Sequence, residues 1–70
     1  MFVEKERVNY EDLVMIKKGT LLAVKMMDRD EKYFWGYVMV LDDPQYGVYK
    51  VMSCADNIEM SLLYSQLYKI

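Results

Sequence analysis

The stretch KYFWGYVMVL, residues 32–41, constrains the fold more than any other part of the chain. Its β-branched and aromatic residues favour a strand, and the Asp-Asp-Pro that follows favours a turn. Successive side chains of a strand point to opposite faces. One face would therefore carry Tyr33, Trp35, Tyr37 and Met39, and the other Phe34, Gly36, Val38 and Val40. A domain of 70 residues cannot bury both faces, so one of them is a second packing surface or a binding surface.

The length predicts one small domain, residues 1–70, near the lower limit of what folds without help. Chains of this size often add a disulfide or a metal to a small core. Cys54 is the only cysteine, which excludes an internal disulfide, and the absence of histidine excludes zinc sites built from His and Cys. The sequence therefore predicts no metal and no cofactor, and a fold held by packing alone or by packing plus association.

The apolar residues are unusual in type, with seven methionines and seven tyrosines. Methionine suits adaptable binding surfaces and tyrosine is enriched at interfaces, although both could also fill the core and rim of a small barrel. A net charge of −2 argues against binding of a phosphate backbone. The charged start of the chain does not resemble a signal peptide, and a lone thiol fits a reducing compartment, so we expect a cytoplasmic protein without a membrane span.

Turn signals divide the chain into short segments. Asn9 is a candidate N-cap, with Glu11 and Asp12 in the first turn of a short helix over residues 10–16; a strand over residues 13–16 is the alternative. A mid-strand glycine such as Gly36 often marks a bend or bulge. Strands are expected at residues 2–8 (a short edge strand), 20–27, 32–41, 48–54, 58–62 and 67–70, with a 3₁₀ turn at residues 63–66.

The order of these segments resembles an SH3-like barrel of the Tudor or chromo type. The resemblance covers residues 17–70: a Lys-Gly-Thr entry, three meandering strands, a short fourth strand, and a 3₁₀ turn before the closing Ser-Gln-Leu-Tyr-Lys at residues 65–69. It implies a mainly β fold, a five-stranded barrel on which residues 1–16 pack as an N-terminal segment. A superfold of this kind does not by itself imply a function.

Strand pairing gives an expected binding surface. If Val38 and Val40 point inward, an inward Tyr49 and Val51 on the neighbouring strand leave its alternate residues outside. The alternative is that residues 1–16 fold back and cover this face. The expected partner-binding residues are Tyr33, Trp35, Tyr37, Met39, Val48 and Met52.

Catalysis is poorly supported, because without histidine the commonest general base and any Ser-His or Cys-His pair are missing. Cys54 is expected to be a buried structural thiol. The acidic pairs at residues 28 and 30 and at residues 42 and 43 are expected to cap turns rather than to bind calcium. Trp35, Tyr33, Tyr37 and Tyr49 have the residue types of an aromatic cage for a methylated cation, although a cage needs rings from more than one strand.

The sequence therefore predicts a non-catalytic protein-binding module, an adaptor or an inhibitor of a larger enzyme of the kind phages encode. Its partner would be another protein or a second copy. One alternative is a small barrel that stacks single-stranded nucleic acid on its aromatic rings. The other is a homo-oligomeric structural subunit whose edges, at residues 2–8 or 67–70, pair between copies.

Overall fold

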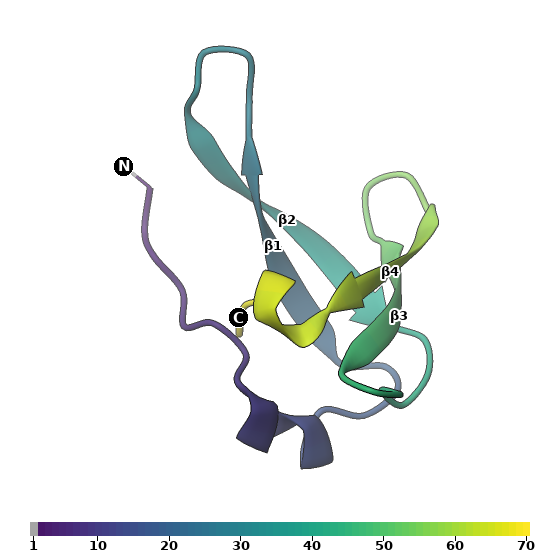
Figure 1. The fold of residues 1–70 in the computed structure, drawn as a ribbon. Helices are drawn as coiled ribbons and strands as arrows, with labels where there is room; N and C mark the ends of the chain where they lie inside the picture. Colours follow the sequence, from purple (N-terminus) through teal and green to yellow (C-terminus); the bar gives the residue numbers. More distant parts are fainter. Residues whose placement is uncertain (1) are drawn as a thin grey trace.

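The fold is a curled antiparallel sheet with a short 3₁₀ helix before it and another after it (Figure 1). The computed structural model describes residues 2–70. The four strands lie in the order β1 (Leu21–Met27), β2 (Tyr33–Val40), β3 (Val48–Ser53) and β4 (Glu59–Leu63). The 3₁₀ helices are η1 (Tyr10–Val14) and η2 (Tyr64–Gln66). The expectation of a mainly β fold is confirmed.

Strand β2 is paired very differently with its two neighbours. It pairs with β1 along nearly its whole length, from Met27↔Tyr33 to Leu21↔Met39. It pairs with β3 only at its end, from Val38↔Ser53 to Val40↔Val51. The outer half of the β1–β2 hairpin, residues 24–36, therefore extends beyond the other strands. We call this half the arm, and it forms the long hairpin at the top of Figure 1.

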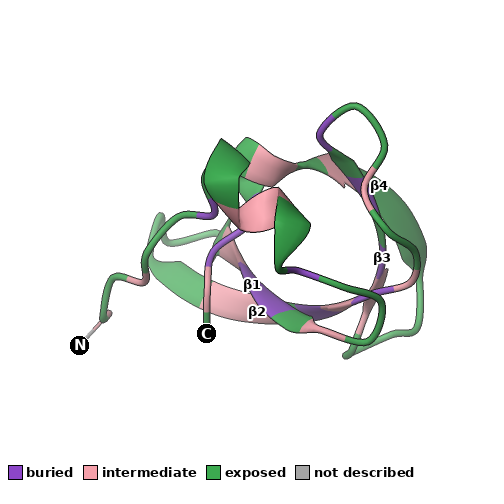
Figure 2. Ribbon diagram, turned by 90° about the horizontal axis from the view of Figure 1, so that it is seen from below, coloured by how far each residue is buried: buried purple, intermediate pink, exposed green. Residues whose placement is uncertain are grey.

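The core lies on the concave face of the sheet, where alternate residues of β1, β2 and β3 meet both 3₁₀ regions (Figure 2). The expected inward residues of the inner part of the sheet are confirmed by burial, because Val38, Val40, Tyr49 and Val51 are all nearly inaccessible to solvent. Segments at both ends of the chain complete this core. Its buried members are Val8, Ile16, Leu22, Val38, Val40, Tyr49, Val51 and Leu67.

The two end segments of the chain pair with each other. The Val8 N–H donates to the Leu67 carbonyl at 2.8 Å, and the Lys69 N–H donates to the Glu6 carbonyl at 2.7 Å. Tyr68 also exchanges two backbone hydrogen bonds of 2.8 Å with Ala23 of β1. These are isolated bridges rather than strands. The structure thus has a four-stranded, open sheet instead of the expected five-stranded barrel, because within residues 67–70 only Tyr68 forms a bridge to β1.

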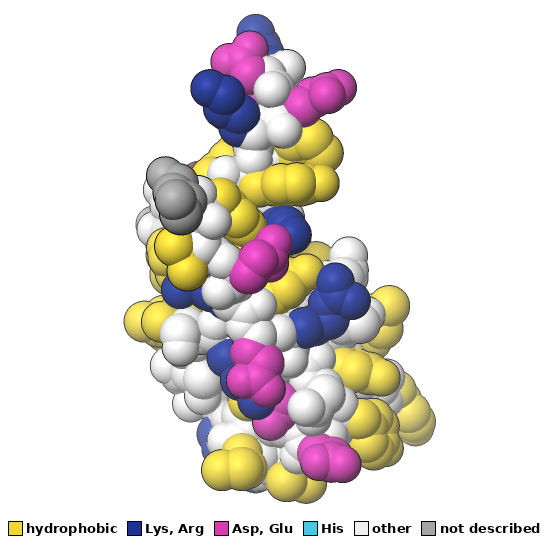
Figure 3. Space-filling model, turned by 90° about the vertical axis from the view of Figure 1, so that its left-hand side faces the viewer, with side chains coloured by type: hydrophobic (Ala, Val, Ile, Leu, Met, Phe, Trp, Pro, Cys, Tyr) yellow, Lys and Arg dark blue, Asp and Glu magenta, His cyan; other side chains and the backbone are white. Residues whose placement is uncertain are grey.

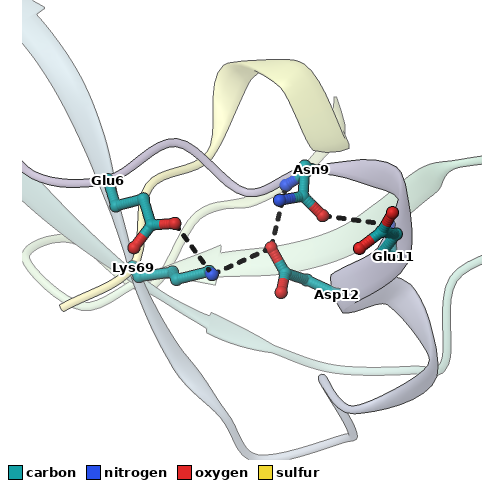
Figure 4. A network of polar contacts seen from close by, with 5 residues as sticks. All are labelled: Glu6, Asn9, Glu11, Asp12 and Lys69. Atoms are coloured by element: carbon teal, nitrogen blue, oxygen red, sulfur yellow. Dashed lines mark hydrogen bonds and ion pairs between the residues drawn. The ribbon is translucent and has the colours of Figure 1, made fainter.

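Helix η1 begins where the sequence predicted it. The Asn9 side chain accepts from the Glu11 N–H at 3.0 Å, and Asp12 Oδ2 accepts from the Asn9 N–H at 2.9 Å, which together form a capping box. Lys69 links this cap to the end of the chain, with its Nζ 3.1 Å from Asp12 Oδ2 and 3.4 Å from Glu6 Oε1 (Figure 4). The segment is a 3₁₀ helix that ends at Val14, rather than the expected helix to residue 16.

Of the acidic residues expected to cap turns, only Asp28 accepts such hydrogen bonds among the described residues; the side chains of Asp30, Asp42 and Asp43 accept none there. Asp28 caps the arm's turn by accepting from the N–H groups of Asp30 and Lys32 at 2.9 and 3.0 Å, and Gly47 takes the expected positive φ of 76°. Gly36 does not form a bulge, because the β1–β2 register runs through it without interruption. A Cβ at this position would lie 2.6 Å from Met26 Sδ, so the missing side chain leaves room for Met26.

Candidate functional site

The convex face of the sheet carries the residues that the sequence predicted as a binding surface. The alternation is as expected, so the odd-numbered residues of β2 and the even-numbered residues of β3 face outward. Tyr33 and Tyr37 have 49% and 43% of their surface exposed, and Val48 is also exposed. Trp35, Met39 and Met52 are half-buried. The six residues do not form one continuous patch, however.

Three strands bring apolar side chains together around Met39. In the register, Met39 lies directly opposite Leu21 of β1 on one side and opposite Met52 of β3 on the other. Tyr37 precedes Met39 by two residues on the same face. We call Leu21, Tyr37, Met39 and Met52 the Met39 patch. Leu21 was not among the predicted residues, since only the β1–β2 register reveals that it faces Met39.

Val48 lies apart from this patch. Lys50 stands between Val48 and Met52 on the same face, and its Nζ lies 4.0 Å from Glu59 Oε2 of β4. Val48 is instead opposite Leu63, so these two exposed residues form a separate apolar pair at the far end of the β3–β4 hairpin.

Trp35 is a centre of packing rather than an open binding residue. Phe2 stacks on its ring at 5.0 Å between centroids, and Tyr68 meets it edge-on at 4.9 Å. The indole Nε1–H donates to the Val3 carbonyl at 2.7 Å. The N-terminal segment thus covers one part of the convex face, around Trp35, and leaves the Met39 patch open.

Lys25, the register partner of Trp35 on β1, places a positive charge between the N-terminal segment and the rings of Tyr33 and Phe2. Its Nζ lies 2.8 Å from Glu4 Oε1, 4.6 Å from the centre of the Tyr33 ring and 5.4 Å from that of Phe2. The hydrogen bond to Glu4 is the main reason that the pKa of Lys25 is raised above its usual 10.5. The lysine therefore stays charged at neutral pH and holds the N-terminal segment against the aromatic rings.

The arm exposes apolar side chains on both of its faces. Met27 and Tyr33 lie opposite each other on the convex side, and Met26 and Phe34 do so on the concave side. Met26 and Phe34 are 45% and 44% exposed, so Phe34 shares the face of Val38 and Val40, as the alternation predicted, but is not buried. The arm extends beyond β3, so its concave side leaves the core at Met26 and Phe34, whereas Val24 at its base still packs against the core.

In Figure 3 the arm is seen from the side. Acidic and basic side chains cluster at its tip, and hydrophobic side chains lie directly below them. The tip is the charged sequence from Asp28 to Lys32, which follows the last strand residue of β1 and precedes the first of β2. The exposed apolar part of the arm is thus confined to its shaft, between the charged tip and the curled sheet.

The structure gives little support to an aromatic cage, a buried thiol or a metal site. Tyr49 is fully buried on the concave face, so it is not brought together with Tyr33, Trp35 and Tyr37 in an aromatic cage. Cys54 is exposed, which corrects the expectation of a buried thiol, because it lies just after β3 in the turn to β4. Within residues 2–70, no cluster of three or more potential metal ligands occurs, and no helix is long and apolar enough to cross a membrane.

Comparison with protein-family models, with curated proteins and with solved structures gives no match.

Proposed function

We propose that this protein is a non-catalytic protein-binding module that holds its partner on the Met39 patch. The observation that carries the proposal is the run of partly exposed apolar side chains across β1, β2 and β3, with Leu21, Met39 and Met52 directly opposite one another. Water contact with such a run is unfavourable, and contiguous apolar surface on a small protein commonly marks a binding site.

The residue types in the patch suit recognition of a protein. The two methionines have flexible, polarisable side chains that adapt to the shape of a partner. Tyr37 adds a large ring whose hydroxyl can form a hydrogen bond at the edge of an interface. Lys50, which pairs with Glu59 beside the patch, would belong to a polar rim around this apolar centre.

The role that fits such a module is that of an adaptor or of an inhibitor that covers a site on a larger cytoplasmic enzyme, as phage-encoded modulators do. We also propose that this open sheet is related to the SH3-like barrels. This relationship is supported by the order of the strands, by η2 before the final segment, and by the bridge from Tyr68 to Ala23 beside β1. In this interpretation the convex face around Met39 is the outside of the barrel.

The test uses two matched tyrosine substitutions. Tyr37→Ser removes an exposed ring from the Met39 patch, and Tyr46→Ser removes a fully exposed ring from the turn between β2 and β3. Each variant and the wild type would be used as bait in lysate, and the affinity for any captured protein would then be measured with purified components. We expect Tyr37→Ser to weaken binding at least tenfold and Tyr46→Ser to leave it unchanged.

Two results would contradict the proposal. Equal binding by both variants would place the interface elsewhere. Capture that disappears after nuclease treatment, and that falls steeply with salt, would instead indicate single-stranded nucleic acid, because counterion release makes such binding depend on salt. Thermal unfolding of both variants would be recorded first, so that loss of binding is not confused with loss of the fold.

A further inference from the structure

One edge of the arm carries backbone groups that bond to nothing else among residues 2–70. In the antiparallel pair, the N–H and C=O groups of Phe34 and Gly36 point toward β1, so those of Tyr33 and Trp35 point to the opposite side. Strand β3 does not reach this part of β2, because their pairing begins at Val38. The Cys54 N–H, which donates to the Tyr37 carbonyl at 2.9 Å, marks where this free edge ends.

The free edge borders a hollow in the surface. The hollow is lined by residues 31–35 and by Phe2 and Val3. Phe34 points to the opposite face of β2 from Tyr33 and Trp35. The lining of the hollow therefore includes residues from both faces of β2, and Phe2 and Val3 form its other wall. The edge also lacks the protection that natural edges usually have, since Tyr33, Phe34, Trp35 and Gly36 include no charge and no proline.

We propose that this edge pairs with the same edge of a second copy, so that two arms join into one continuous antiparallel sheet. A two-fold axis beside Phe34 would place Tyr33 of each copy opposite Trp35 of the other. In that register, the two free N–H groups and the two free C=O groups of each copy all form hydrogen bonds. The edge is therefore complementary to itself in both number and direction of donors and acceptors.

The side chains agree with this register. The two Phe34 rings would face each other on the concave side, and each Tyr33 would face a Trp35 on the convex side; cross-strand aromatic pairs of this kind stabilise sheets. Lys32 would face Gly36, so that no charge is placed opposite a like charge. The Glu31 backbone has a φ of +60° and leaves the strand direction before it would meet Cys54 of the second copy.

Other registers and other edges fit less well. An axis beside Trp35 would place Tyr33 of the second copy where Cys54 already bonds to Tyr37. The end segments, which were expected from the sequence to pair between copies, already bond to each other at Val8–Leu67 and Glu6–Lys69. The proposal does not depend on the Met39 patch, which lies on the inner part of the sheet and binds its partner whether or not the arms pair.

The backbone test compares two chains prepared by chemical synthesis. N-methylation of the Tyr33 amide blocks the free edge of β2. Met27 is the register partner of Tyr33 on β1, and N-methylation of its amide blocks the opposite edge of the arm. Both changes keep the side chains and the β1–β2 hydrogen bonds. Sedimentation equilibrium over a wide concentration range should show a dimer for the wild type. Its dissociation constant should rise at least tenfold for methylated Tyr33 and stay within twofold for methylated Met27.

A second test probes the register. Non-hydrogen-bonded pairs have Cα atoms about 4.5 Å apart, which suits a disulfide. With Cys54→Ser as the background, Phe34→Cys should therefore form a disulfide-linked dimer under mild oxidation, and far faster than Tyr46→Cys, whose site is fully exposed. A monomer at every concentration would overturn the proposal. So would equal weakening by the two N-methyl groups, or equal rates of cross-linking at residues 34 and 46.

Discussion

The two halves of strand β2 have similar residues and very different surroundings. In the inner half, Val38 and Val40 are almost completely buried. In the half that belongs to the arm, Phe34 lies on the same face. It is larger than either valine, yet it is nearly half exposed. The difference is that β3 pairs with the inner half only, whereas Phe2 and Tyr68 contact the arm on its other face, at Trp35. Alternation along the strand therefore sets which face a residue joins, and the reach of the neighbouring strands decides whether that part of the face becomes core.

The largest difference in stability between a packed and an exposed position of the same face is expected on β1. Leu22 and Met26 lie on the same face of the same strand, but Leu22 is 2% exposed and Met26 is 45% exposed. Leu22→Ala should lower the free energy of unfolding by about 2–5 kcal/mol, because it leaves a cavity in the core. Met26→Ala should change it by about 0.5 kcal/mol or less. Urea denaturation measures both, and equal losses would show that the arm is packed as tightly as the core.

A smaller effect is expected at Trp35, which packs against Phe2 and Tyr68 on the convex side of the arm. Trp35→Ala removes its contacts with Phe2 and Tyr68 and its hydrogen bond to Val3. We expect it to cost about 1–3 kcal/mol, which is less than for a fully buried tryptophan. Tyr37→Ala, two residues along the same face, should cost about 0.5 kcal/mol or less. Thermal unfolding of the two variants would show whether the N-terminal segment stabilises the arm.

The hydroxyl groups of Tyr49 and Tyr68 provide a second pair of positions, one without a hydrogen-bond partner among the described residues and one with a partner. The Tyr49 hydroxyl is buried in the core without a hydrogen-bond partner among the described residues, and burial raises the pKa of this phenol above 10.0. Tyr49→Phe should therefore be neutral or stabilise the fold by up to about 1 kcal/mol. The Tyr68 hydroxyl accepts a 2.9 Å hydrogen bond from Arg7, so Tyr68→Phe should cost about 0.5–1.5 kcal/mol. Denaturant midpoints would separate the two outcomes, and a loss for Tyr49→Phe would indicate a hydrogen bond to bound water.

The smallest expected effect depends on pH and involves the cap of η1. The Asn9 N–H is the main cause that lowers the pKa of Asp12 below its usual 3.8, and Lys69 contributes as well. Because the folded state favours the ionised carboxylate, this stabilisation is present above pH 3.8 and is lost as the pH falls through the lowered pKa. Melting temperatures between pH 2 and 6 should decline less steeply for Asp12→Asn than for the wild type. Lys69→Gln should keep most of the decline, since Asn9 remains.

Local features were predicted well from the sequence because they depend on neighbouring residues. The alternation in residues 32–41 gave the correct faces for Val38 and Met39, and Asn9 was the correct cap. What the sequence could not show depends on pairing between distant segments. The short overlap of β2 with β3 leaves Phe34 exposed, Phe2 covers Trp35, and Tyr68 bridges β1 without extending into a strand. None of these follows from a periodicity, because each depends on how far a segment distant in the sequence reaches along the sheet.

The bridge between the end segments has a mechanical consequence. Arg7 and Tyr68 are 61 positions apart in the chain, and the two segments run antiparallel, with Lys69 bonded to Glu6 and Leu67 bonded to Val8. A force applied to the two ends would therefore load these hydrogen bonds one after the other, in an unzipping geometry, rather than all at once. The segments should peel apart at low force and withdraw Val8 and Leu67 from the interior, which makes tension an effective way to open this fold.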